Sequence, residues 1–132
     1  MYTPAFTAVV SNDLNYPNEK SVVEFHDTLS NIGNHFQLEN SIFICPYNGT
    51  YAFFLNILND VNALASVDLM QDGVRLVPIW ADGREIGHNG ISTSAIVKCV
   101  AGSEIWSESN VGNIMIRGAN YSVVSGYLIS RN

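Results

Sequence analysis

Tight-turn sequences interrupt this chain at short intervals, and the segments between them are rich in Val, Ile, Phe, Tyr and Thr. The turns include Asn-Gly or Asp-Gly pairs that begin at Asn48, Asp72, Asp82 and Asn89. Glycine after Asn or Asp supplies the positive φ angle that short hairpin turns need. No segment keeps the 3.6-residue period of an amphipathic helix over three turns. The pattern therefore predicts an all-β fold, most simply a sandwich of two sheets.

The predicted strands fill a single domain. The chain has 132 residues and contains no internal repeat or low-complexity linker, which suits one compact unit. The expected strands are residues 5–10, 22–27, 41–45, 50–58, 64–71, 74–80, 92–100, 104–109 and 121–129.

Two of the expected strands are apolar on both faces. In 50–58, one face carries Tyr51 and Phe53 and the other carries Ala52 and Phe54, and 121–129 shows a similar pattern. A strand with one solvated face alternates apolar and polar side chains, so the second faces of these strands need a cover. A neighbouring subunit would supply it, and long loops folded over the same face are the alternative.

The share of charged residues is 14%, compared with about 25% in an average domain. Such sparse charge suits a subunit that buries part of its outside. The net charge is −6 and the 6 basic residues do not cluster, so we expect no binding to nucleic acid. No apolar run approaches the length of a membrane helix, so no membrane insertion is expected. The sequence also lacks the basic start followed by an apolar stretch that would mark a signal peptide.

Several landmarks follow the order and spacing of one known family. They are Ala5-Phe6-Thr7-Ala8, Phe43-Ile44-Cys45-Pro46-Tyr47-Asn48-Gly49-Thr50-Tyr51-Ala52-Phe53, Leu69-Met70-Gln71-Asp72-Gly73, Gly102-Ser103-Glu104-Ile105-Trp106 and Val124-Ser125-Gly126-Tyr127-Leu128. On these residues the chain resembles the globular head domain of complement C1q, in the tumour-necrosis-factor-like (TNF-like) superfamily. Ser103 and Val124 depart from the usual Asp and Phe, and the Gly-X-Y repeat of a collagen stalk is absent from the sequence.

The resemblance implies a ten-stranded jelly roll over residues 5–132 that forms a compact homotrimer. Residues 1–4 would be a natural start or a remnant that precedes the domain. The resemblance also implies a secreted, lectin-like recognition module of innate immunity that binds microbial or cell-surface carbohydrate or protein and has no enzymatic activity. A TNF-like ligand that clusters a receptor and a structural scaffold are the alternatives.

The resemblance places the outer face of 50–58 and 121–129 against neighbouring subunits. The candidate interface residues are Tyr51, Phe54, Leu58, Val124 and Tyr127. In the resembled jelly roll, strand 50–58, which Cys45 just precedes, and strand 92–100, which holds Cys99 near its end, are antiparallel neighbours, so a disulfide between the two cysteines is conceivable. Two buried thiols are the alternative.

The stretch 80–90 is the richest candidate for ligand binding, because loops on a rigid sandwich often carry binding sites. Its side chains Arg84, Glu85, His88 and Asn89 can form hydrogen bonds with sugars or anions. Arg117 lies in a second candidate stretch, 110–120, which also contains Asn113. A solvated connection without a ligand is the alternative for both.

Catalytic and metal motifs give little support for an enzyme. His26, His35 and His88 lack the tight spacing of a metal motif, and His26 and Asp27 would point to opposite faces of a strand. Members of the resembled family sometimes bind calcium through loop oxygens, so Asp68, Asp72 and Asp82 are candidates, with solvated turns as the alternative. No other cofactor and no catalytic residue is expected. Sequons for glycosylation begin at Asn48 and Asn120.

Overall fold

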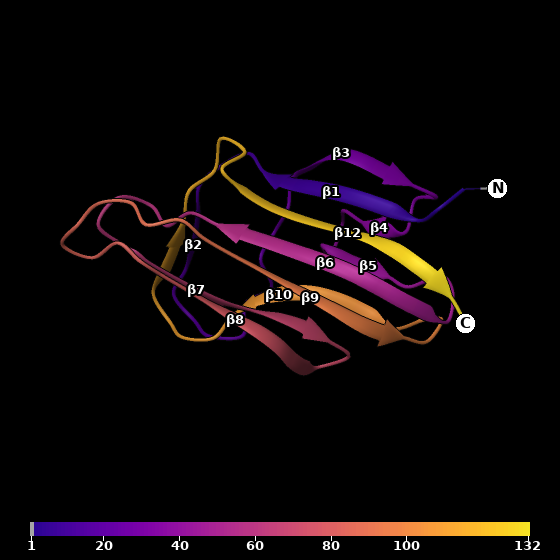
Figure 1. The fold of residues 1–132 in the computed structure, drawn as a ribbon. Helices are drawn as coiled ribbons and strands as arrows, with labels where there is room; N and C mark the ends of the chain where they lie inside the picture. Colours follow the sequence, from indigo (N-terminus) through magenta and orange to yellow (C-terminus); the bar gives the residue numbers. More distant parts are fainter. Residues whose placement is uncertain (1) are drawn as a thin grey trace.

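The computed structural model describes residues 2–132, and Met1, a natural start or a remnant on sequence grounds, lies outside the described residues. The described chain is all β (Figure 1). Among residues 2–132 there is no helix that could span a membrane. The strands are β1 (Ala5–Val10), β2 (Leu14–Tyr16), β3 (Asp27–Ile32), β4 (Phe36–Gln37), β5 (Ile42–Ile44), β6 (Gly49–Ile57), β7 (Leu64–Gln71), β8 (Val74–Asp82), β9 (Ile91–Cys99), β10 (Glu104–Ser109), β11 (Ile114–Ile116) and β12 (Ser122–Arg131).

Two five-stranded sheets form the sandwich. The first sheet has the order β3-β1-β12-β6-β9, and the second sheet has the order β4-β5-β10-β7-β8. Strands far apart in the sequence lie side by side, such as β1 next to β12, as a jelly roll requires. A short pair, β2 and β11, is added to these ten strands. The predicted all-β jelly roll is therefore confirmed.

The sandwich has two different ends. Both chain termini lie at one end, on the right in Figure 1. The loop of residues 83–90, between β8 and β9, projects at the opposite end together with the connection that follows β6 (Figure 1). We call this opposite end the loop end.

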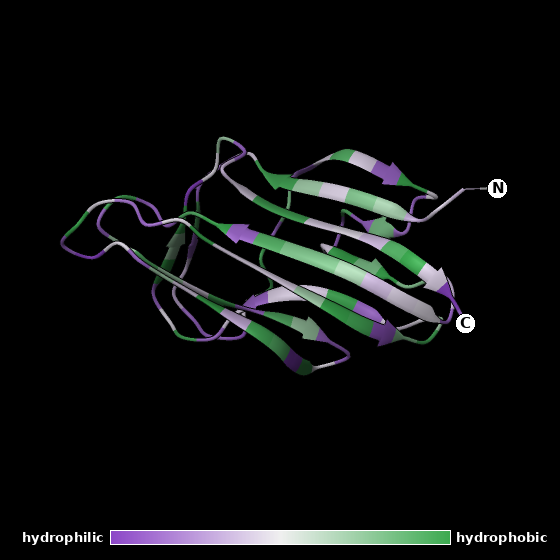
Figure 2. Ribbon diagram, in the orientation of Figure 1, coloured by the Kyte–Doolittle hydropathy of each residue, from purple (hydrophilic) through white to green (hydrophobic). Residues whose placement is uncertain are grey.

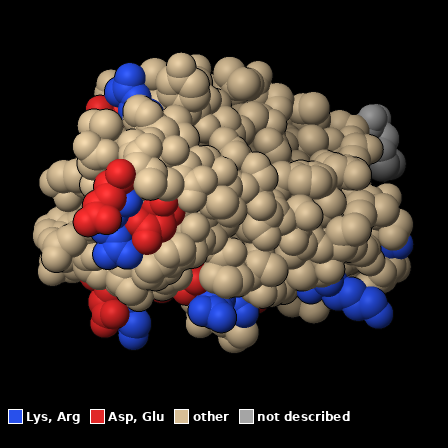
Figure 3. Space-filling view, turned by 60° about the vertical axis from the view of Figure 1, so that its left-hand side comes forward, with Lys and Arg blue, Asp and Glu red and all other residues tan. Residues whose placement is uncertain are grey.

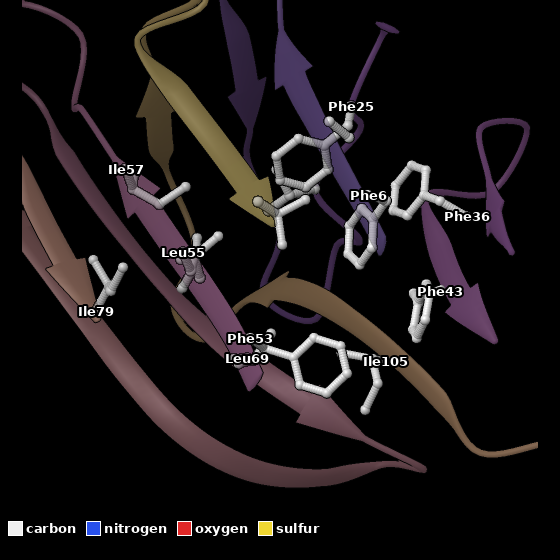
Figure 4. Close-up of a cluster of buried hydrophobic side chains, with 14 of the residues drawn as sticks. Phe6, Phe25, Phe36, Phe43, Phe53, Leu55, Ile57, Leu69, Ile79 and Ile105 are labelled. Atoms are coloured by element: carbon white, nitrogen blue, oxygen red, sulfur yellow. The ribbon is translucent and has the colours of Figure 1, made fainter. Parts of the chain in front are cut away.

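Phenylalanine rings from both sheets fill part of the core (Figure 4). Phe6 of β1 stacks on Phe36 and Phe43, with ring centroids 4.9 and 4.7 Å apart. Phe53 of β6 meets Phe43 edge to face at 5.7 Å. Aromatic pairs of this kind stabilise a fold by about 0.5–1.5 kcal/mol beyond their burial. They hold the first sheet against the second.

The prediction of a strand at 22–27 is wrong. The alternation of buried and more exposed side chains that led to this prediction is present, since Val23 and Phe25 are buried. The backbone N–H of Val23, however, donates to the carbonyl of Ser107 in the second sheet, whereas the N–H of His26 donates to the carbonyl of Val9 in the first sheet. This segment therefore crosses between the sheets and cannot extend a ladder in either one. The strand that follows, β3, begins at Asp27.

Candidate functional site

The outer face of the first sheet carries an exposed aromatic pair. Phe54 of β6 and Tyr127 of β12 are 44% and 43% exposed. Their rings stack with centroids 6.4 Å apart and planes 11° apart. Ile96 of β9, which is 70% exposed, and Tyr127 both pair with Ala52, so all three side chains share a face with Phe54. We call Ala52, Phe54, Ile96 and Tyr127 the aromatic face.

The surroundings of the aromatic face carry little charge. Figure 2 shows hydrophobic colouring along most of β6. A groove of about 360 Å³ lies along the same strand, and all its lining residues are uncharged: Phe54, Leu55, Asn56, Ser92, Thr93, Ser94, Val123 and Ser125. In Figure 3 the charged side chains lie mainly at the left, along the lower edge and at the right edge, and the centre and upper part of the view are a broad uncharged area. This side of the molecule is poorly suited to full exposure to water.

Two of the residues predicted for the interface lie in the core instead. Tyr51 is 0% exposed, and its hydroxyl donates to the backbone carbonyl of Tyr47 at 2.8 Å. Val124 is also buried and pairs with Leu55. Side chains alternate along a strand, so Tyr51 and Val124 face inward while Phe54 and Tyr127 face outward. Leu58 follows the end of β6 and is half-buried.

At the loop end, the buried side chain of Asn59 organises the loop 83–90. Its Nδ2 donates to the carbonyls of Ala63 and Gly87 at 3.0 and 2.9 Å, and its Oδ1 accepts the backbone N–H of Asn89 at 2.6 Å. A Cβ atom on Gly83 would lie 1.9 Å from that Nδ2, so only glycine fits there. Sequence reasoning missed Asn59, because an Asn after a strand resembles an ordinary turn residue.

Arg84 is held at the loop end by a carboxylate and an indole ring. Its Nε donates to Asp82 Oδ1 and its NH2 group donates to Asp82 Oδ2, both at 2.9 Å. These hydrogen bonds hold the pKa of Asp82 at about 2, below its ordinary value. The guanidinium carbon lies 5.9 Å from the centroid of the Trp80 ring. Arg84 is thus fixed in one orientation despite its exposure.

A cavity of about 410 Å³ opens beside Arg84. It brings together the two candidate stretches, 80–90 and 110–120, because Arg84 and Asn113 both line it. The lining residues are Asn62, Ala63, Leu64, Arg84, Gly112, Asn113 and Met115. We call this cavity the loop-end pocket.

The other predicted binding residues are more scattered. Glu85 and His88 are exposed on loop 83–90, and Asn89 donates from Nδ2 to the carbonyl of Asp82 at 3.2 Å. Arg117 is not a lining residue of the loop-end pocket, and its NH1 group donates to Asp13 Oδ1 at 3.0 Å. The structure brings Arg84 and Asn113 together and leaves Arg117 apart from them.

Cys45 and Cys99 are both buried, and both are free thiols in the structure. Cys99 pairs with Gly49 in the first sheet, and Gly49 follows Cys45 closely in the sequence. A hydrogen bond between the two thiols, together with burial, raises the pKa of Cys45, and the same hydrogen bond lowers the pKa of Cys99. The two cysteines are therefore neighbours, as predicted, without a covalent bond between them.

The candidate calcium ligands are each engaged separately. Asp68 accepts from Asn110 Nδ2, Asp72 accepts from the backbone N–H of Glu104, and Asp82 binds Arg84. Within the part of the chain that the structure describes, no three His, Cys, Asp or Glu side chains gather in a way that could hold a metal. His26 Nδ1 accepts the backbone N–H of Ser11, which gives this histidine a structural role.

Comparison with known proteins identifies the family of this chain. The family model of the C1q domain matches residues 5–129. Caprin-2 of Danio rerio is 27% identical over 101 residues, which cover 76% of this chain and 11% of Caprin-2, so the chain spans only a small part of that relative.

Two solved structures share the fold. The globular domain of the zebrafish complement 1qA protein has a TM-score of 0.76 at 24% identity, with 98% of this chain and 99% of that chain covered. The structure of Eiger TNF from S. frugiperda has a TM-score of 0.83 at 8% identity, with 100% of this chain and 96% of that chain covered.

Proposed function

The chain belongs to the C1q-domain family, and from this membership we propose that it is a non-enzymatic recognition module that acts as a homotrimer. C1q/TNF-like domains generally assemble as trimers and bind ligands rather than catalyse reactions. C1q-domain homologues are typically secreted, so the proposed place of action is outside the cell, in innate immunity.

The observation that carries the proposal is the exposed stack of Phe54 on Tyr127. A lone subunit would leave these two rings and Ile96 in water. Covering them removes apolar surface from water, which stabilises an assembly by roughly 25 cal/mol per Å². Aromatic side chains are also enriched in the centres of protein interfaces.

A threefold assembly follows if the aromatic face meets a different surface of the next subunit. Such a head-to-tail contact closes into a ring when the rotation between subunits is a third of a turn. The first sheet would then lie inside the assembly, and the outer face of the second sheet and the loop end would remain open to ligands.

Light scattering coupled to size exclusion tests the trimer. We expect the mass of three chains for the wild type at micromolar concentration, and the mass of one chain for the double variant Phe54→Lys/Tyr127→Lys. Val74→Lys is the matched control, because Val74 is also exposed but belongs to the second sheet. A wild-type monomer, or a double variant that remains trimeric, would contradict the proposal.

The ligand class separates the recognition role from its alternative. We propose that the module binds carbohydrate or protein patterns on microbial or cell surfaces, whereas a TNF-like signalling ligand would cluster a receptor. Parallel screens against immobilised glycans and against receptor ectodomains distinguish the two roles. Binding to receptor ectodomains alone would favour the signalling role.

A further inference from the structure

We infer that the loop-end pocket and the adjoining Trp80 ring form a binding site for an uncharged saccharide. This inference rests on the recognition role proposed above and names the class of ligand. It follows from the shape, the charge and the rigidity of one small region.

The size and lining of the pocket suit a sugar ring. About 410 Å³ lies within the usual range for small-ligand sites. Ala63, Leu64 and Met115 supply apolar surface, and the amides of Asn62 and Asn113 supply both donors and acceptors. A pyranose needs this mixture, because its ring faces expose C–H groups and its edges expose hydroxyls.

The charge of the site favours an uncharged ligand. Among residues 2–132, Arg84 is the only charged one that lines the pocket, and its guanidinium is already bound by both oxygens of Asp82. A sulfate, phosphate or carboxylate ligand would have to compete with that bidentate pair. The N–H groups of Arg84 that Asp82 does not bind can instead donate to a sugar hydroxyl.

Trp80 extends the site along β8. Its side chain is 52% exposed, and Arg84 stands between the indole ring and the pocket, since Arg84 lies over the ring and also lines the cavity. An exposed indole held beside a polar pocket offers a flat apolar surface to the C–H face of a second sugar unit. The site therefore suits a chain of sugars better than a single one.

The walls of the pocket are fixed before any ligand binds. The backbone N–H of Asn62 donates to the carbonyl of Gly87, and that of Asn113 donates to the carbonyl of Pro17. Asn62 and Asn113 both have positive φ angles, 56° and 57°, a conformation that Asn tolerates better than most residues. A preformed site loses less entropy when the ligand binds.

Isothermal titration with defined oligosaccharides tests the inference. The probes are maltotetraose, mannotetraose and chitotetraose as uncharged chains, and a heparin hexasaccharide as a polyanion. We expect at least one uncharged probe to bind and the heparin probe to bind more weakly. Preference for heparin, or no binding by any uncharged probe, would overturn the inference.

Variants locate the binding to this site. Trp80→Ala is expected to weaken binding about tenfold, the size of one aromatic contact. Asn113→Gly tolerates the positive φ angle and removes only the amide, so a loss of binding there reports the lost hydrogen bonds. Trp106→Phe is the matched control, because Trp106 lies on β10, outside the pocket lining. An equal effect of Trp106→Phe and Trp80→Ala would overturn the assignment.

The mass of each sample, measured by light scattering, separates this inference from the proposed function. A trimer that binds no uncharged probe contradicts the saccharide site alone. A monomer that binds the probes through Trp80 contradicts the trimer and supports the site.

Discussion

Asn59 and Asn89 are joined by a hydrogen bond of 2.6 Å in which the backbone N–H of Asn89 donates to Asn59 Oδ1. The same buried amide donates to the carbonyls of Ala63 and Gly87. One side chain therefore ties loop 83–90 to the segment after β6. Since Ala63 and Arg84 both line the loop-end pocket, Asn59 sets the position of its walls.

Replacing Asn59 with Ala is expected to lower the free energy of unfolding by about 2 kcal/mol, measured by urea denaturation. The substitution leaves the N–H of Asn89 without its acceptor, and an unsatisfied buried group costs roughly 1–3 kcal/mol. The carbonyls of Ala63 and Gly87 each lose one of two donors and keep a backbone N–H. Water that enters the space left by the amide reduces the total below a simple sum.

Asn59→Asp sharpens this test. The carboxylate keeps an acceptor for Asn89 but faces the carbonyls to which the amide donated. We expect a loss of stability at pH 7 that is partly recovered below about pH 4, where the protonated carboxyl can donate again. If neither variant changes the midpoint of unfolding, the amide does not hold the loop end.

The fold could be predicted largely from local pattern. The strands 64–71 and 104–109 match β7 and β10 residue for residue, because each lies between clear turn sequences. The short strands β2, β4 and β11 were missed, since two or three residues carry no period. The strand β3 was missed as well, because its sequence Asp-Thr-Leu-Ser-Asn-Ile is mostly polar. Alternation alone could not show that segment 22–27 crosses between the sheets, because burial on alternate residues is the same in both cases.

The candidate site was only partly predictable. Arg84 and Asn113 were both selected for their side-chain chemistry, but their meeting in one pocket depends on the packing of two distant loops. Tyr51 and Phe54 lie on opposite faces of one strand by the sequence pattern alone. Both faces are apolar, however, so the pattern did not show which face points into the core. The structure buries Tyr51 and leaves Phe54 on the surface.

The pKa of Asp82 predicts a titration at low pH. It is about 2 in the folded protein compared with 3.8 for an ordinary Asp, chiefly because the Arg84 side chain donates to the carboxylate. The lower folded pKa means that the ion pair contributes to stability above about pH 4, and that this contribution is lost as the pH falls through about 2. NMR titration of the Asp82 carboxyl carbon should show the low midpoint, and Arg84→Met should move it up toward the ordinary value.

Asp13 supplies a contrast for the same experiment. Its pKa is also lowered, but the backbone N–H of Gly118 is the larger cause and the Arg117 side chain the smaller one. Arg117→Met should therefore raise the Asp13 midpoint only in part. A full return of Asp13 to its ordinary value in that variant, or no change of Asp82 in Arg84→Met, would contradict these assignments.

Thiol titration tests the state of Cys45 and Cys99. We expect two free thiols in protein prepared without reductant and then denatured, because the structure has both cysteines free. In the folded protein, the reaction of Cys45 should be slow at pH 8, since the hydrogen bond with Cys99 and then burial raise its pKa and the thiolate is the reactive form. No free thiols in the denatured sample would show that the pair forms a disulfide.

Close packing in the core explains the glycine at position 126, between Ser125 and Tyr127 in the last of the family landmarks. A Cβ atom at this position would lie 2.5 Å from a ring carbon of Phe53 and 2.8 Å from one of Phe6. Both rings are buried in the packed core, so neither can move away without disturbing its neighbours. Gly126→Ala should therefore lower the free energy of unfolding by about 1–3 kcal/mol, the usual cost of overpacking, as measured by urea denaturation.

Gly90→Ala is the matched control, because its added Cβ would come no closer than 3.4 Å to the nearest atom. Equal effects of the two substitutions would mean that lost backbone freedom, and not the close approach to Phe6 and Phe53, accounts for the result.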